Sequence, residues 1–136
     1  MSAFPVADPH ASGLHAEWYE ANRAAGAVTA QRCDGGHWRH PARYRCGECG
    51  STRWTFEPVG PEAVVESWTI TRRALHPSFA DAVPYGIVFA HTAEGPRFFV
   101  HTRPSLGPDD TIGIGEAVTL AVDEFGVPYA ELSRSR

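Results

Sequence analysis

The sequence predicts a mainly β protein that consists of an N-terminal helix, a rubredoxin-like zinc ribbon and a five-stranded OB-fold barrel. Apolar residues near the N-terminus recur at helical spacing, whereas five later segments alternate apolar and polar residues and are separated by turn residues. Between these two regions, all three cysteines of the chain occur in one short stretch. The chain has 136 residues, which is enough for one domain with an apolar core.

The N-terminal part is expected to be a flexible leader over residues 1–12, followed by a helix over residues 13–27. Prolines interrupt regular structure in the leader, and Ser12 is suited to cap the helix. Gly26 is a plausible stop signal because glycine adopts the left-handed conformation that ends many helices. The expected apolar stripe of the helix consists of Leu14, Trp18, Ala21 and Ala25.

The five alternating segments predict a barrel over residues 61–136. Strands with almost no helix between them, in a chain of this size, favour the OB-fold over a larger sandwich. The last strand is expected in "VPYAEL", near the C-terminus. The predicted apolar faces are Val64, Trp68 and Ile70 in the first segment, Tyr85, Ile87 and Phe89 in the second, Phe98 and Val100 in the third, and Val118, Leu120 and Val122 in the fourth.

The cysteines predict a zinc ribbon over residues 28–60. Cys46 and Cys49 form a C-x-x-C pair in "CGECG", where the glycines permit the tight turn that brings two thiolates to one ion. Cys33 precedes Cys46 by 13 residues, a usual spacing for a ribbon. Gly36 stands where a second C-x-x-C pair would have its other cysteine. Three thiolates therefore need a fourth ligand of another kind.

His37 is the preferred fourth ligand, because a Cys-x-x-x-His loop can close on zinc with one extra residue. His40 is the second choice and Asp34 the third. A closed set of four ligands would make the zinc structural, since catalytic zinc keeps one position open for water. The alternative is a ribbon without metal, held by the aromatic side chains of Trp38, Tyr44, Trp54 and Phe56.

A zinc-dependent deaminase is the enzymatic alternative. Those enzymes combine an H-x-E motif with P-C-x-x-C, and this chain has His15 and Glu17 upstream of Cys46 and Cys49. Arg45 replaces the proline, and the β pattern that follows does not fit the mixed sheet that such a site requires. The deaminase is therefore the weaker hypothesis.

Charge and hydropathy exclude several classes of partner. The net charge of −4 argues against a nucleic-acid surface, and Arg72 and Arg73 are the only adjacent basic pair in the barrel segments. The apolar runs are too short for a membrane span, and the N-terminus lacks the features of a signal peptide. An odd number of cysteines fits metal binding in a reducing compartment, so we expect a cytoplasmic protein.

The order of these parts resembles the acyl-CoA-associated zinc-ribbon/OB-fold family, long described as a domain of unknown function. The resemblance rests on "EWYEANRAAGAVTAQRC", on "CGECGS" and on "HPSFADAVPYGIVFAHTAEGPRFF", and it covers residues 13–132. The family's ribbon has two C-x-x-C pairs, which Cys33, Cys46 and Cys49 match and Gly36 does not. The resemblance implies structural zinc and a small subunit that binds thiolase-fold proteins of the lipid-transfer type.

The function implied by the resemblance is that of an accessory subunit of a thiolase-like acyl-CoA aldolase, a retro-aldol lyase, with steroid side-chain thioesters among the substrates. It would support the fold and the acyl-CoA channel of its partner, in a complex with two copies of each chain. A thiolase or acyltransferase complex is the close alternative, and a free-standing OB-fold binding module is another. The sequence offers no recognisable catalytic residue.

Five aromatic residues are candidates for partner contacts, because aromatic side chains bury a large area at low entropic cost. For Trp18, packing within the chain is the favoured interpretation, and Tyr85 is also expected to fill the barrel. The candidates are Trp18, Tyr19, Trp38, Phe79 and Tyr85.

Overall fold

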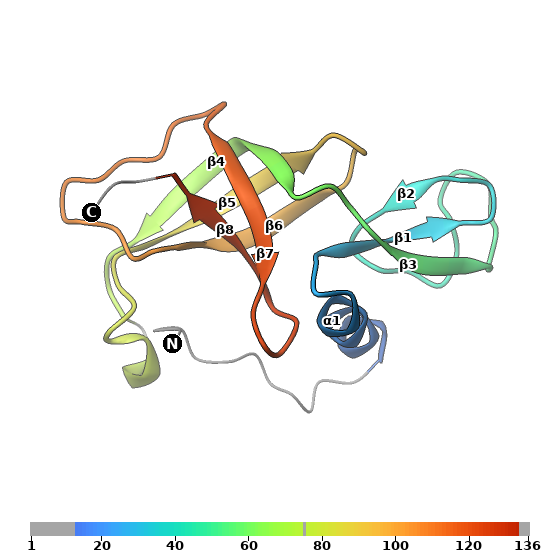
Figure 1. The fold of residues 1–136 in the computed structure, drawn as a ribbon, viewed down its shortest axis with the longest axis horizontal. Coiled ribbons are helices and arrows are strands. Elements are labelled where there is room, and N and C mark those ends of the chain that lie inside the picture. The colour runs from blue at the N-terminus through green and yellow to red at the C-terminus, as the bar shows by residue number, and fades with distance from the viewer. Residues whose placement is uncertain (1–12, 75, 134–136) are drawn as a thin grey trace.

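The computed structural model describes residues 13–74 and 76–133, in which one helix and a small sheet lie beside a closed barrel (Figure 1). The predicted leader over residues 1–12, including the proposed cap Ser12, lies outside the described residues. Within the described residues, no helix is long and apolar enough to cross a membrane.

Helix α1 spans Gly13–Ala25. It ends two residues before the predicted boundary at residue 27 and directly before the predicted stop signal, because Gly26 has a φ of 63° and breaks the helical path. Only part of the predicted stripe is buried: Trp18 is buried, but Ala25 is exposed. The other buried residue of the helix is the polar Asn22, which lies one turn after Trp18 and was not expected.

The ribbon contains a three-stranded antiparallel sheet with strand order β2-β1-β3. The central strand β1 (Thr29–Cys33) pairs on one side with the short β2 (Trp38–Arg39) and on the other with β3 (Trp54–Pro58). In the register, Cys33 lies opposite Trp54 at the end of the β1–β3 ladder. The sheet therefore delivers Cys33 to the loops that carry the other cysteines.

The remaining five strands close into a barrel with the order β4-β5-β6-β8-β7, as predicted for an OB-fold. All neighbouring strands are antiparallel except β6 and β8, which are parallel. A short 3₁₀ helix, η1 (Pro77–Phe79), lies between the first two strands. The strands are β4 (Glu62–Thr71), β5 (Tyr85–Thr92), β6 (Arg97–Arg103), β7 (Ala117–Val122) and β8 (Pro128–Leu132).

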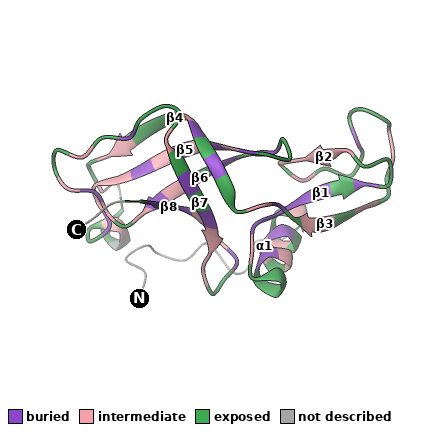
Figure 2. Ribbon diagram, turned by 45° about the horizontal axis from the view of Figure 1, so that its top comes forward, coloured by how far each residue is buried: buried purple, intermediate pink, exposed green. Residues whose placement is uncertain are grey.

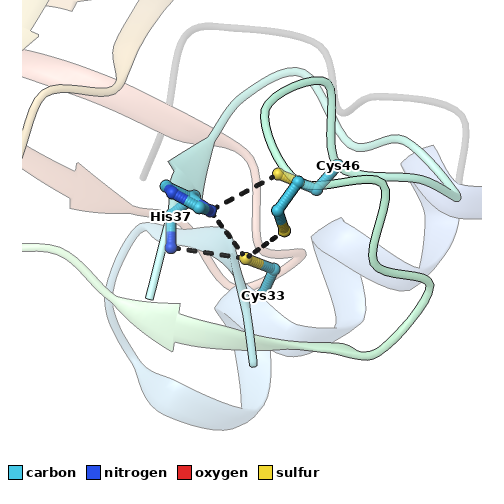
Figure 3. Close-up of side chains that lie close together, drawn as sticks. Cys33, His37 and Cys46 are labelled. Carbon is cyan, nitrogen blue, oxygen red and sulfur yellow. Dashed lines mark hydrogen bonds between the residues drawn. The ribbon is translucent and has the colours of Figure 1, made fainter. Parts of the chain in front are cut away.

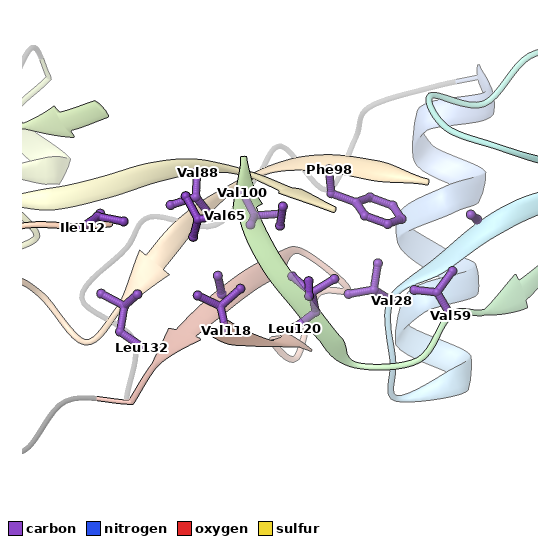
Figure 4. Packing of buried hydrophobic residues seen from close by; sticks show 14 of the residues in the cluster. Val28, Val59, Val65, Val88, Phe98, Val100, Ile112, Val118, Leu120 and Leu132 are labelled. Atoms are coloured by element: carbon purple, nitrogen blue, oxygen red, sulfur yellow. The ribbon is translucent and has the colours of Figure 1, made fainter. Parts of the chain in front are cut away.

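The barrel interior is filled by branched aliphatic side chains and one phenylalanine, Phe98 (Figure 4). The predicted faces of β6 and β7 are the ones that point inward. The predicted face of β5 is wrong, because Val88 and Ala90 are fully buried and Gly86 is buried next to them. A side chain at Gly86 would collide with Ile112 Cδ1, at 2.4 Å. Small residues therefore occupy the interior here, and the larger Tyr85, Ile87 and Phe89 lie outside.

Strand β4 presents the predicted face only in its second half. Its ladder with β5 shifts register between Val65 and Ser67, which is a β-bulge. Before the bulge, Val65 points inward and Val64, which is 44% exposed, points outward. After it, Trp68 and Ile70 pair with the inward-facing Val88 and Gly86; Ile70 packs against the core, whereas Trp68 remains 42% exposed. Figure 2 shows that β4 contains both buried and exposed residues. One extra residue changes the alternation, and simple period-two counting does not anticipate it.

An aromatic cluster joins α1, the ribbon and the barrel. The indole of Trp18 lies parallel to the ring of Phe98, with centroids 6.1 Å apart, and donates a 2.6 Å hydrogen bond from Nε1 to the carbonyl oxygen of Thr29. The centroid of the His40 imidazole lies 4.5 Å from the ring centroids of both Trp18 and Phe98. Burial lowers the pKa of His40 to about 4, so this ring is neutral at neutral pH.

Candidate metal centre

The first two donor residues lie on either side of a tight turn that follows β1. The N–H of Gly36 donates a 2.9 Å hydrogen bond to the carbonyl oxygen of Cys33. The N–H of Cys33 donates a 3.0 Å hydrogen bond to the carbonyl oxygen of His37. Gly36 has a φ of 85°, a conformation that residues with a side chain rarely adopt. The residue found in place of the missing cysteine therefore forms the turn that brings His37 back toward Cys33.

The other two donor residues lie on the C-x-x-C loop. The N–H of Gly50 donates to the carbonyl oxygen of Cys46, and the N–H of Cys46 donates to that of Ser51, both at 2.9 Å. Gly50 has a φ of 75°, which closes the loop. This geometry places the sulfurs of Cys46 and Cys49 beside the first turn.

The four donor atoms of Cys33, His37, Cys46 and Cys49 all lie within 4.8 Å of one another (Figure 3). The Sγ atom of Cys33 is 3.7 Å from Sγ of Cys49 and 3.3 Å from Nδ1 of His37, and Sγ of Cys46 is 3.8 Å from the same nitrogen. A tetrahedron with zinc–sulfur bonds of ~2.3 Å has edges of ~3.8 Å. The donor set and its spacing therefore fit one zinc ion.

The surroundings of the donors favour ligation. Backbone N–H groups of Cys49 and Glu48 lower the pKa of Cys46 to about 6, so its thiolate form is accessible at neutral pH. Glu48 Oε2 lies 3.6 Å from His37 Nε2, the nitrogen that does not face the sulfurs. A carboxylate in this position orients the imidazole and makes it a better ligand.

The alternative ligands lie elsewhere. His40 is buried in the cluster with Trp18 and Phe98, and Asp34 accepts a 2.6 Å hydrogen bond from the hydroxyl of Ser51. His15 lies on α1 and is 2.9 Å from the hydroxyl of Tyr19. None of the three belongs to the cluster of four donors, so the deaminase arrangement is not formed.

The five aromatic candidates for partner contacts separate into three groups. Trp18 is buried in the chain's own core, as the packing interpretation expected. Tyr19 and Trp38 line a groove of about 1110 Å³ that lies between the ribbon and the barrel. Phe79 and Tyr85 stack on each other, with centroids 6.0 Å apart, and Tyr85 lies on the outer face of β5 instead of filling the barrel.

Comparison with protein-family models identifies both parts of the chain. Residues 23–55 match the model described as "ChsH2, rubredoxin-like zinc ribbon domain", and residues 56–123 match "ChsH2, C-terminal OB-fold domain". The chain belongs to the ChsH2 family. The first match ends at Thr55 and the second begins at Phe56, both within β3, so the ribbon and the barrel follow one another directly in this sequence.

Solved structures share the fold of this chain. A chain of the structure described as "Ltp2-ChsH2(DUF35) aldolase" is 26% identical, with a TM-score of 0.77, and the match covers 93% of this chain and 100% of that one. A DUF35-family protein of unknown function from Sulfolobus solfataricus shares the fold at 12% identity and a TM-score of 0.57, over 90% of this chain and 87% of that one. A comparison with curated protein sequences finds no significant match.

Proposed function

We propose that this chain is the accessory subunit of a heteromeric aldolase, in which a thiolase-fold protein of the lipid-transfer type carries out the chemistry. The observation that carries this proposal is the match to a chain of the Ltp2–ChsH2(DUF35) aldolase, which extends over that chain's full length. Because the match covers 93% of this chain and 100% of the other, the same backbone elements carry the surface residues of both chains. A shared framework supports a shared kind of partner.

In this proposal the metal centre is structural. Cys33, His37, Cys46 and Cys49 would complete a tetrahedral shell and leave no position open for water. A bound zinc would tie the turn after β1 to the C-x-x-C loop, two segments that the ribbon sheet itself leaves unpaired. The ion would therefore hold the shape of the ribbon surface and take no part in the reaction.

The proposed substrate of the complex is an acyl-CoA thioester that undergoes retro-aldol cleavage, with steroid side-chain thioesters among the candidates. The small subunit would support the partner's fold and the acyl-CoA channel. A thiolase or acyltransferase complex is the alternative, and the similarity to a chain of an aldolase complex favours the lyase. Two copies of each chain are expected, because a subunit bound to a two-fold dimer repeats with its symmetry.

Two of the aromatic residues are the preferred partner contacts. Tyr19 and Trp38 line the groove between ribbon and barrel and remain partly accessible. Phe79 and Tyr85 form a second candidate contact around η1, whereas Trp18 would act indirectly, through the core that it packs.

The test is reconstitution with the lipid-transfer-type thiolase-fold protein of the same organism. We expect the two chains to elute together as a complex of defined mass, and a β-hydroxyacyl-CoA to be cleaved by the complex and not by the small chain alone. Turnover by the small chain alone would contradict the accessory role. A partner that is fully active and stable without the chain would contradict it as well.

A further inference from the structure

The groove between the ribbon and the barrel has a cationic wall on the ribbon and an apolar wall on the barrel. Trp38, Arg39 and Arg43 contribute to the wall on the ribbon, and Phe89 and Phe99 contribute to the wall on strands β5 and β6. The volume of about 1110 Å³ is at the upper end of the range of ligand pockets in proteins. The outer surface of these two barrel strands is also where OB-folds commonly bind their ligands.

The barrel wall is apolar and exposed. The rings of Phe89 and Phe99 stack with centroids 4.2 Å apart, and Phe99 retains 71% of its surface exposed. A side chain of this size gains little from its own fold when it is so exposed. Stacked aromatic rings on a surface are typical of the anchors of protein interfaces.

The ribbon wall is cationic. The side chain of Arg39 is fixed by hydrogen bonds from Nε to Gln31 Oε1 at 2.6 Å and from Nη2 to the carbonyl oxygen of Arg43 at 2.8 Å. Its third nitrogen, Nη1, is buried without a hydrogen-bond partner within the described part of the chain. The backbone N–H of Arg43 donates to the same Gln31 oxygen at 2.7 Å, while its side chain is exposed.

Neither Arg39 nor Arg43 forms an ion pair among residues 13–74 and 76–133, although the whole chain has 16 acidic and 12 basic residues. The two carboxylates of the groove are engaged elsewhere: Glu48 faces His37, and Glu94 accepts a hydrogen bond from the backbone N–H of Gly60 at 3.1 Å. Two arginines that face a groove in an acidic protein, without carboxylates of their own, match an acidic group on a binding partner.

We propose that this groove is the docking site for an acidic amphipathic segment of the partner protein. Apolar side chains of that segment lie against Phe89 and Phe99, and its carboxylates pair with the exposed Arg43, near the positive charge of Arg39. The inference rests on the proposed function for the existence of the partner, and it adds the surface and the kind of segment. It also extends the interface beyond Tyr19 and Trp38, which line the same groove, to residues that the sequence pattern placed inside the barrel or left unassigned.

The test uses two exposed positions and two matched controls. Phe99→Ala removes the apolar anchor, and its control Ile114→Ala removes a side chain that is 76% exposed and does not line the groove. Arg43→Glu reverses a charge in the groove, and its control Arg73→Glu reverses an exposed charge that does not line it. Thermal unfolding of all four variants is expected to match the parent, because none of the four side chains is buried.

The measurement is the Kd for the lipid-transfer-type protein of the same organism, by calorimetry at low and high salt. We expect Phe99→Ala and Arg43→Glu each to weaken binding by about tenfold or more, and the controls to change it by less than about twofold. Binding of Arg43→Glu is also expected to depend less on salt than that of the parent.

Each other outcome contradicts a different statement. If the parent chain does not bind this protein at all, the proposed function fails. If the parent binds and all four variants bind equally well, the partner exists and the docking site is wrong. If the chain associates with itself in sedimentation experiments, and Phe99→Ala abolishes that association, the groove is occupied by a second copy.

Discussion

The carboxamide of Asn22 joins helix α1 to the turn between β7 and β8, because its Nδ2 donates a 3.0 Å hydrogen bond to the carbonyl oxygen of Gly126. Its Oδ1 accepts hydrogen bonds from the N–H and the hydroxyl of Thr29, both at 2.8 Å. One fully buried side chain therefore contacts the helix's two neighbours, the first residue of the ribbon sheet and a turn of the barrel. These contacts fix how the ribbon sits on the barrel.

Asn22→Ala is expected to lower the free energy of unfolding by about 2 to 4 kcal/mol, because it removes three hydrogen bonds and leaves buried groups unpaired. Urea denaturation measures this loss. Glu17→Ala, on the exposed side of the same helix, is the control and should change the free energy by less than about 0.5 kcal/mol. Equal stability of both variants would mean that the Asn22 contacts contribute nothing.

Gly126→Ala is expected to destabilise the protein by about 2 kcal/mol or more. Gly126 has a φ of 83°, and an added Cβ would lie 2.0 Å from the carbonyl oxygen of Tyr19. Gly95 has a φ of 114° and open space around it, so Gly95→Ala reports backbone strain alone and should cost about 1 kcal/mol. If thermal unfolding finds the two variants alike, the close approach of the turn to α1 is not as described.

His37→Ala and Cys33→Ser are each expected to abolish stable zinc binding, whereas the parent chain should contain about one zinc per chain. Elemental analysis of protein without an affinity tag gives the metal content. His15→Ala is the control and should retain the metal, because His15 lies outside the cluster of donors. Metal retained without His37 and lost without His15 would restore the deaminase arrangement.

His101 is expected to make the protein less stable in acid. Burial, followed by the charge of Arg103, lowers the pKa of His101 to about 4, although Asp123 opposes the shift. Because the unfolded chain, with a histidine pKa of ~6.5, binds the proton more readily than the folded one, stability falls as the pH drops from about 6.5 to about 4. The full loss is about 3 kcal/mol.

The check on His101 compares the parent with His101→Gln, which keeps an acceptor for the Nε–H of Arg103, now 3.2 Å from His101 Nε2. The difference in unfolding free energy between the two proteins should change by about 3 kcal/mol between neutral pH and pH of about 4. The subtraction removes the contribution of the cysteines, which both proteins share. A constant difference would show that His101 titrates normally.

Local patterns in the sequence predicted the fold class well and the strand faces less well. Alternation identified β5, but Tyr85, Ile87 and Phe89 have larger side chains than Gly86, Val88 and Ala90, so the outer face was taken for the inner one. The interior of a closed small barrel limits side-chain volume, and this limit comes from the opposite wall, which the strand's own sequence does not contain.

The clustering of the four candidate metal donors could be predicted because its determinants are local. Cys33 and His37 belong to one turn, and Cys46 and Cys49 to another, so spacing alone indicates which atoms converge. The role of Asn22 could not be predicted, since a polar residue on a helix ordinarily faces water and its partner Gly126 is 104 residues away. The groove likewise depends on how the ribbon and the barrel are placed side by side.

The measurement that bears most directly on the proposed function is the rate at which a β-hydroxyacyl-CoA is cleaved by the lipid-transfer-type thiolase-fold protein, with and without this chain. We expect cleavage to require both proteins, to saturate at one copy of this chain per partner, and to be lost when the catalytic residues of the partner are replaced. Cleavage that proceeds at the same rate in the absence of this chain, or that this chain catalyses alone, would contradict the proposal.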